Sequence, residues 1–284
     1  MLWPAARLLD QALLASGDAR VRLAAARRLV PCDVPLGGWA ALAWMGVTPL
    51  DGRTGPGGTT LLPVPVCTGP TGRVRPRPGL AVDRSTLLAV DVVEHDGALV
   101  TSAERSCLDV MRFCGAEEGL VAADAAVRAG LTTREQLSEA LSRMVGLKGV
   151  PQARIAVPLV DGRAESGPES RLRYVWVVEA GLPVPLVNPV LVDLDGQFVA
   201  RVDLLDPEAA TVGEYDGAHH RELEQHTADN VREEDVEGLN LEVTRSTALD
   251  LWPHRPRLVA RLTAARRRGI CRDRSKDAWG FRQT

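Results

Sequence analysis

Apolar residues at helical spacing mark the first part of the chain. Before about residue 46, positions such as Leu8, Leu9, Ala12 and Leu13 recur on one side of a helical wheel, with arginines on the opposite faces, and this pattern predicts short helices. Further helices are predicted over residues 102–113, 116–129 and 132–144. Thr133 with Gln136 has the spacing of a helix cap. Between these helical stretches, glycines and prolines crowd residues 52–63 and 69–79, and apolar runs predict strands over 61–67 and 87–93.

The pattern changes after a segment rich in Pro and Gly at residues 150–170. A helix is predicted from about Pro168 to Ala180, and Gly181 follows it as a C-terminal glycine. Asp195-Gly196 joins two apolar runs, which is a strong hairpin signal. The predicted strands cover residues 190–194, 197–205, 210–215 and 241–245, and further helices cover 221–238 and 254–268. The predicted order is helix, three strands, helix, strand and helix.

The length and this change of pattern predict two domains. A chain of 284 residues exceeds the usual single domain, so we expect an α+β region at residues 1–150 and an α/β domain at 160–284. No run of eighteen apolar residues occurs, so no membrane span is predicted. Arg7 and Asp10 interrupt the apolar start, which predicts an amphipathic helix rather than a signal peptide, and a cytoplasmic location is expected.

Cysteines and charge add two expectations. The five cysteines are scattered and contain no C-x-x-C pair, so buried thiols are expected rather than disulfides or a zinc site. The net charge of -3 does not indicate a nucleic-acid binder, but the segment from Arg255 to Thr284 holds ten Arg or Lys residues and is locally basic. A solvated helix face is the ordinary alternative for such a segment.

Acidic residues gather at the ends of the predicted strands. Asp203 closes the second run of the hairpin, and Glu214 and Asp216 close the next strand. Neighbouring strands of this length bring Asp203 beside Glu214, and the spacing of two puts Glu214 and Asp216 on one side. Clustered carboxylates are ligands for Mg²⁺ and are costly without a cation. Taken singly, each of these residues is more commonly a solvated residue of a strand or turn.

Two further groups stand near this cluster in sequence. His219 and His220 follow at once and could serve as general base, as partners of a phosphate or as metal ligands, or could be exposed loop residues. Upstream, Glu165, Glu169 and Arg173 are spaced by four, which puts them on one helix face. Glu169 is the better candidate to reach a metal, and an i,i+4 ladder of ion pairs is the alternative.

These segments together resemble a known family. Their order and spacing are similar to those of actinobacterial proteins whose C-terminal domain is related to the very-short-patch-repair endonuclease of the PD-(D/E)xK superfamily. The segments that carry the resemblance are Ala164-Glu165-Ser166-Gly167-Pro168-Glu169-Ser170-Arg171-Leu172-Arg173, Ala180-Gly181-Leu182-Pro183, Val199-Ala200-Arg201-Val202-Asp203-Leu204, Glu214-Tyr215-Asp216-Gly217-Ala218-His219-His220, Asp229 with Arg232, and Val243-Thr244-Arg245.

The resemblance implies a restriction-endonuclease-like domain with an αβββαβ core, a mixed sheet flanked by helices. It implies a Mg²⁺ (or Mn²⁺) site at Glu169, Asp203 and Glu214, assisted by Asp216 and by His219 or His220. The superfamily pattern E-x-K is replaced here by Glu214-Tyr215-Asp216. The very-short-patch-repair type also lacks this lysine and uses histidine, so the resemblance implies that a histidine fills the role.

The first half more distantly resembles the region that accompanies such domains, which is similar to abortive-infection-type antitoxins. Residues 39–50 and 100–110 carry this likeness, above all Thr101-Ser102-Ala103-Glu104-Arg105-Ser106-Cys107-Leu108-Asp109. The extreme N-terminus departs from that pattern because it is short and lacks a clear helix-turn-helix.

Two classes of function follow. The first is a metal-dependent endonuclease acting on DNA in repair or defence, with phosphate contacts from Arg173, Arg232, Arg245, Arg261, Arg266, Arg267 and Arg268. The second is a catalytically inactive DNA-binding regulator or antitoxin-like module that binds a protein partner. RNA or a nucleotide-like molecule stays open as substrate, and a homodimer stays open because cutting both strands generally needs two sites.

Overall fold

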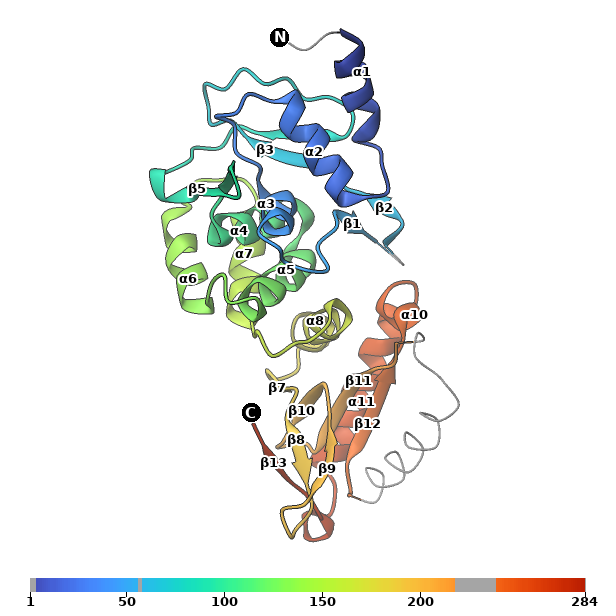
Figure 1. Ribbon diagram of the computed structural model, residues 1–284. Coiled ribbons are helices and arrows are strands. Elements are labelled where there is room, and N and C mark those ends of the chain that lie inside the picture. Colours follow the sequence, from blue (N-terminus) through green and yellow to red (C-terminus); the bar gives the residue numbers. More distant parts are fainter. Residues whose placement is uncertain (1–3, 56–57, 218–238, 284) are drawn as a thin grey trace. The chain divides into compact units, whose positions relative to one another are not determined.

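The structure of the protein, a computed structural model, describes residues 4–55, 58–217 and 239–283. The chain is of the mixed α/β type and divides into two compact units, Met1–Gly162 and Arg163–Thr284 (Figure 1). No helix within the described residues is long and apolar enough to cross a membrane. Each unit has its own helices and sheets, so each is described by itself.

The first unit is built from helices with three small two-stranded pairings. Its helices are α1 (Pro4–Leu13), α2 (Ala19–Leu29), α3 (Gly38–Trp44), α4 (Ala103–Cys114), α5 (Ala116–Arg128), α6 (Arg134–Arg143) and α7 (Val150–Ala156), with short 3-10 turns η2 (Ala89–Asp91) and η3 (Val157–Leu159). Its strands are β1 (Arg53–Thr54), β2 (Thr60–Leu61), β3 (Val64–Cys67), β4 (Leu80–Asp83), β5 (Val92–His95) and β6 (Ala98–Thr101). Strands β1 with β2 and β5 with β6 pair antiparallel, whereas β3 with β4 pair parallel.

Side-chain caps define where the helices of this unit begin. The Ser102 hydroxyl accepts the backbone N–H of Arg105 at the start of α4, and the Thr133 hydroxyl accepts that of Gln136 at the start of α6. Both caps satisfy a donor that the first helical turn leaves open. The predicted helices and the Thr133 cap are therefore confirmed. The strand predicted over residues 87–93 is wrong in extent, because a 3-10 turn occupies its middle and β5 starts at Val92.

The second unit combines several helical segments with two small sheets. Its helical segments are α8 (Gly167–Tyr174), the π-helix η4 (Val175–Glu179), α10 (Ala248–Leu251), α11 (Arg255–Ile270) and the 3-10 turn η5 (Arg274–Lys276). Its strands are β7 (Leu186–Val187), β8 (Val190–Val192), β9 (Phe198–Arg201), β10 (Leu204–Asp206), β11 (Thr211–Tyr215), β12 (Glu242–Ser246) and β13 (Gly280–Arg282). The helix predicted after Pro168 is confirmed, and it widens into a π-helix before Gly181 ends it with a positive φ of 62°.

The strands of the second unit form two sheets with different partners. The first has the order β12-β11-β10-β7, with β11 and β12 parallel and the other pairs antiparallel. The second has the order β13-β8-β9, antiparallel throughout. The hairpin at Asp195-Gly196 is confirmed as β8 and β9. The single strand predicted over residues 197–205 is wrong, because the chain bends at residues 202–203 and continues as β10 in the other sheet.

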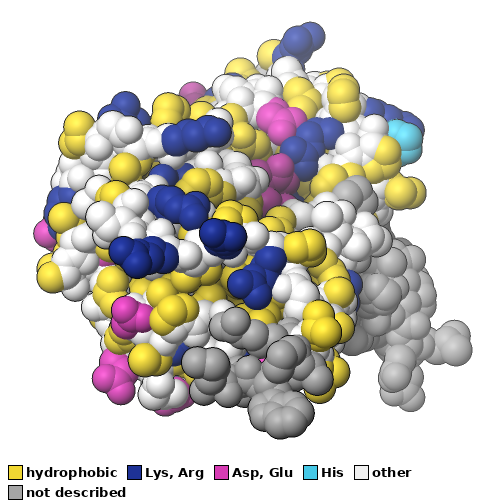
Figure 2. Space-filling view, turned by 90° about the horizontal axis from the view of Figure 1, so that it is seen from above, with side chains coloured by type: hydrophobic (Ala, Val, Ile, Leu, Met, Phe, Trp, Pro, Cys, Tyr) yellow, Lys and Arg dark blue, Asp and Glu magenta, His cyan; other side chains and the backbone are white. Residues whose placement is uncertain are grey.

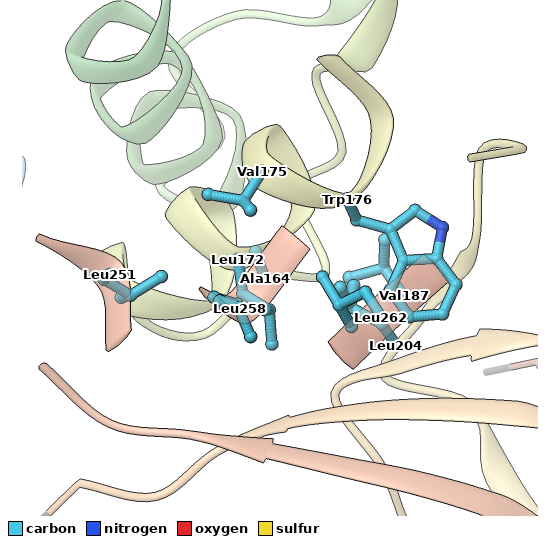
Figure 3. Packing of buried hydrophobic residues seen from close by; sticks show 9 residues of the cluster. All are labelled: Ala164, Leu172, Val175, Trp176, Val187, Leu204, Leu251, Leu258 and Leu262. Carbon is cyan, nitrogen blue, oxygen red and sulfur yellow. The ribbon is translucent and has the colours of Figure 1, made fainter. Parts of the chain in front are cut away.

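Two apolar cores hold the second unit together. One packs α8, η4, α10 and α11 against the first sheet and comprises Ala164, Leu172, Val175, Trp176, Val187, Leu204, Leu251, Leu258 and Leu262 (Figure 3). The other comprises Leu191, Ala200, Val202, Leu205 and Val212. Along β11 the side chains alternate between them: Gly213 approaches the Trp176 ring and Tyr215 packs on the first core, whereas Val212 belongs to the second. Glu214 therefore lies on the same side of the sheet as Val212.

Candidate functional site

Asp203 lies at the bend between β9 and β10, one residue before the antiparallel ladder of β10 with β11. Leu204 is paired with Gly213, so the next step along both strands brings Asp203 beside Glu214. The Oδ2 atom of Asp203 accepts the backbone N–H of Tyr215 at 2.7 Å, which fixes the carboxylate to β11. The predicted approach of Asp203 to the strand of Glu214 is thus present in the structure.

Glu214 stands between a carboxylate and a guanidinium. In the parallel pairing of β11 with β12, Glu214 is the register partner of Arg245, and Nε of Arg245 lies 3.5 Å from Oε2 of Glu214. Asp203, at the bend before β10, thus lies beside Glu214 of β11, and Glu214 lies beside Arg245 of β12. Both members of the ion pair are partly exposed, with side-chain exposures of 25% for Glu214 and 38% for Arg245, so a ligand can reach them.

Glu169 comes to the site from the first turn of α8. The Ser166 hydroxyl caps this helix by accepting the N–H of Glu169 at 3.3 Å, and Pro168 starts it with a fixed φ. Oε2 of Glu169 accepts the N–H of Glu165 at 2.8 Å and Nδ2 of Asn188 at 2.9 Å. Glu165 lies before the helix and pairs with Arg201 at 2.5 Å, so the predicted shared helix face of Glu165 and Glu169 is wrong.

Asn188 was missed by the sequence analysis. It follows β7 directly and joins two site elements: its side chain binds Glu169, and its backbone N–H donates to the carbonyl of Asp203 at 2.9 Å. The signal in the sequence is an Asn between a short apolar run and Pro189, since Asn tolerates the left-handed backbone that a sharp turn requires. That signal marks a turn, and the contacts depend on elements distant in sequence.

The pKa of Asp203 depends on its burial and on its acidic neighbours. Burial raises the pKa of Asp203 to about 7, the charges of Glu169 and Glu214 add to the rise, and the hydrogen bond from Tyr215 opposes it. A carboxylic acid with a pKa near neutrality marks a candidate functional position. A positive ion beside Asp203 would oppose the repulsion from Glu169 and Glu214.

Asp216 continues the parallel pairing beyond β11. Its backbone N–H donates to the carbonyl of Ser246 at 2.7 Å, and the Ser246 hydroxyl donates to the carbonyl of Glu214 at 3.0 Å. Burial and then the charge of Asp216 raise the pKa of the Tyr215 phenol. Asp216 therefore lies at the same end of the sheet as the other acidic residues.

Three of the proposed residues lie outside the described residues. These are His219, His220 and Arg232. The geometry of the site therefore rests on the carboxylates, Asn188 and Arg245.

The arginines expected to contact DNA have different environments. Arg173 is fully buried in α8, so it is not on the surface where a phosphate would meet it, and the predicted contact is not supported. Arg261 pairs with Asp250 at 2.9 Å, Arg266 with Asp206 at 2.8 Å, and Arg268 with Glu242 at 2.7 Å. Arg267 is exposed. The basic composition of α11 thus overstates its available charge, because much of it is paired within the unit.

Figure 2 shows one face of the molecule with its side chains coloured by type. Several Lys and Arg side chains lie near one another on the left half of this face, among hydrophobic and uncharged side chains, and the Asp and Glu side chains lie around this group.

The tightest group of potential metal ligands among the described residues is elsewhere. Oxygen or sulfur atoms of Cys67, Asp83 and Asp109, in the first unit, all lie within 4.8 Å of one another. Two buried arginines already neutralise this group: Arg105 bonds to Asp83 and Asp109 at 3.3 and 2.8 Å, and Arg112 lies 2.5 Å from Asp109. Burial also raises the pKa of the Cys67 thiol. We interpret it as a structural ion-pair network.

Glu169, Asp203 and Glu214 interact electrostatically without converging this closely. Glu169 is bound by Asn188, and Glu214 lies beside Arg245. Such a set suits Mg²⁺, which uses one or two carboxylates and keeps several waters.

Comparisons with known proteins identify relatives for half of the chain. Two uncharacterised proteins of Mycobacterium tuberculosis, from strains CDC 1551 / Oshkosh and H37Rv, are each 31% identical over 144 residues. The match covers 51% of this chain and 52% of each relative, so the chain matches about half the length of these curated relatives. No family model matches, and no solved structure matches. The relatives are thus actinobacterial.

Proposed function

We propose that the second unit is a metal-dependent endonuclease domain that hydrolyses phosphodiester bonds of DNA, with a restriction-endonuclease-like core. The observation that carries the proposal is the placement of Asp203 beside Glu214, which follows from the register of β10 with β11 and from the hydrogen bond of the Tyr215 N–H to Asp203 at 2.7 Å. Burial and the charges of Glu169 and Glu214 raise the pKa of Asp203 to about 7, and a bound divalent cation would offset the cost of its ionised form.

The topology of the first sheet supports the same proposal. A helix, an antiparallel pair and a parallel strand follow one another as α8, β10 with β11, and β12. This is consistent with the later part of the αβββαβ order implied by the resemblance. In the structure the preceding hairpin, β8 with β9, lies in a separate sheet with β13.

In this proposal each side chain has a defined task. Asp203 and Glu214 would hold a Mg²⁺ or Mn²⁺ ion, and a bound ion of this kind would polarise the phosphodiester and lower the pKa of an attacking water. Glu169 completes the acidic set from the helix side. Arg245, beside Glu214, is placed to contact a phosphate oxygen, and Asp216 or a histidine of the 219–220 pair accepts the proton of the water.

The test is cleavage of supercoiled, linear and mismatch-containing DNA by the wild type and by Asp203→Ala, with Mg²⁺, with Mn²⁺ and with a chelator. We expect cleavage that requires the metal and falls at least about a hundredfold in Asp203→Ala. Asp195→Ala is the matched control, because Asp195 is an exposed carboxylate of the same unit at the hairpin turn. Equal activity in both variants, or cleavage in chelator, would contradict the proposal.

One observation favours a second candidate, a DNA-binding regulator or antitoxin-like module that has lost the chemistry. Position 216 carries an acid instead of the lysine of the E-x-K pattern, and Arg245 already neutralises Glu214. This candidate requires that DNA binding persist in chelator and in Asp203→Ala. A wild type that binds DNA and never cuts it would favour the regulator over the nuclease.

A further inference from the structure

Asn188 has an unusual backbone for a residue that is not glycine. It follows β7 with a positive φ of 49°, and it is 6% exposed. Asn and Gly adopt this left-handed conformation at little cost, whereas most other residues are strained there. The backbone conformation at this position therefore favours Asn or Gly. Because the Asn188 side chain is buried, its polar atoms need hydrogen-bond partners within the protein.

Two of the hydrogen bonds of Asn188 reach residues of the acidic site. Its Nδ2 donates to the carbonyl of Arg163 at 2.6 Å and to Oε2 of Glu169 at 2.9 Å. Its backbone N–H donates to the carbonyl of Asp203 at 2.9 Å. One buried residue therefore connects the helix that supplies one carboxylate with the bend that supplies another.

The hydrogen bonds of Asn188 control the separation between Glu169 and Asp203, which no single element sets. Glu169 belongs to α8 and Asp203 to the bend before β10, so their separation depends on how the two elements are joined. Without the amide of Asn188, the Glu169 carboxylate would lose its donor from β7 and could turn away from the repulsion of Asp203. The hydrogen bond thus holds two like charges together.

We propose that Asn188 is a positioning residue of the acidic site, which holds the Glu169 carboxylate at the separation from Asp203 at which the two act on one divalent cation. The inference rests on the proposed function, since it requires that the acidic site bind a metal. It adds a residue outside the carboxylate set whose removal weakens metal binding without removing any ligand.

Two substitutions separate the side chain from the backbone. Asn188→Gly keeps the left-handed backbone and removes the donor. Asn188→Asp keeps the shape but replaces the donor with a carboxylate oxygen facing Glu169 and the carbonyl of Arg163. The matched control is Asn240→Gly in the same unit: Asn240 has a positive φ of 63°, and its Nδ2 donates to the carbonyl of Asp273 at 3.1 Å and to Asp277 at 2.8 Å.

The experiment is calorimetric titration of the full chain with Mn²⁺, with thermal unfolding in the absence of metal as the measure of stability. We expect Asn188→Gly to weaken Mn²⁺ binding roughly tenfold or more and Asn188→Asp to weaken it further. Asn240→Gly should bind Mn²⁺ as the wild type does, although it loses hydrogen bonds of the same kind.

Each contrary result has a distinct meaning. If the wild type and Asn188→Gly bind Mn²⁺ equally well, the positioning role of Asn188 is overturned, but the metal site is not. Equal weakening in Asn188→Gly and Asn240→Gly would also overturn it, because the loss would then be general. A wild type without Mn²⁺ binding would overturn the metal site itself. If Asn188→Gly fails to fold, the Mn²⁺ affinity of the Asn188→Asp variant decides whether Asn188 has the positioning role.

Discussion

At the scale of single residues, the protonation of Asp203 determines how the site responds to pH. Asp203 has an ordinary pKa of about 4 in the unfolded chain. Burial and the charges of Glu169 and Glu214 raise the folded value to about 7. Between these two pH values the folded protein holds a proton that the unfolded chain has released. The free energy of unfolding therefore decreases as the pH rises through this window. Above the window, the folded protein bears the full cost of the ionised, buried Asp203 carboxylate.

Asp203→Asn removes this cost, since the amide is uncharged and its oxygen can still accept the N–H of Tyr215. We expect the free energy of unfolding of the metal-free protein to rise by about 2 kcal/mol at about pH 8 and to stay unchanged at about pH 4. Urea denaturation at both pH values measures it, with Asp195→Asn as the exposed control. A loss of stability of the same size at both pH values would show that the charge is not the cause.

At the scale of elements, close packing of α11 on the sheet depends on a helical glycine. A Cβ added at Gly269 would lie 1.8 Å from the backbone carbonyl oxygen of Ala209, a contact that no side-chain rotation can relieve. The same helix buries Leu258, Leu262 and Ala265 against the unit, so a shift of α11 would disturb the core as a whole. The approach of α11 to the turn between β10 and β11 requires glycine at this point.

Gly269→Ala is expected to lower the free energy of unfolding by at least about 2 kcal/mol, because α11 must move off the backbone of Ala209. Gly217→Ala is the control, since its added Cβ would meet a Tyr215 ring carbon at an ordinary 3.5 Å. Thermal and urea unfolding of the two variants give the comparison. If Gly269→Ala is as stable as Gly217→Ala, the helix is not held this close to the turn between β10 and β11.

At the scale of the whole molecule, the candidate site belongs entirely to one of the two units. Glu169, Asn188, Asp203, Glu214 and Arg245 all fall within Arg163–Thr284, as do both apolar cores that support them. The acidic partners of Arg261, Arg266 and Arg268 in α11 also belong to this unit. Fewer arginines are therefore available to a polyanion than the composition suggests.

A fragment of residues 163–284 is therefore expected to fold and to bind Mn²⁺ with the affinity of the full chain, within about twofold. Circular dichroism checks the folding and calorimetric titration checks the affinity. A folded fragment that has lost metal binding would mean that the first unit contributes to the site.

Much of the local structure follows from the sequence. Three local features are predicted correctly because their signals lie within a few residues of one another. These are the helices after Ser102 and Thr133, the helix end at Gly181 and the hairpin at Asp195-Gly196. The approach of Asp203 to Glu214 also follows from the sequence, since the two residues lie near the ends of apolar runs that are neighbours along the chain.

The tertiary structure decided what depends on distant partners. It split the run at 197–205 between two sheets, because Leu204 and Leu205 pair with β11 while Arg201 pairs with β8. It joined Asn188 to Glu169 and Asp203, and it neutralised arginines of α11 with acids far away in sequence. Composition and periodicity record which residues a segment contains and which face they share. Only the packing of one segment on another determines which charges meet and which side chains hold a carboxylate in place.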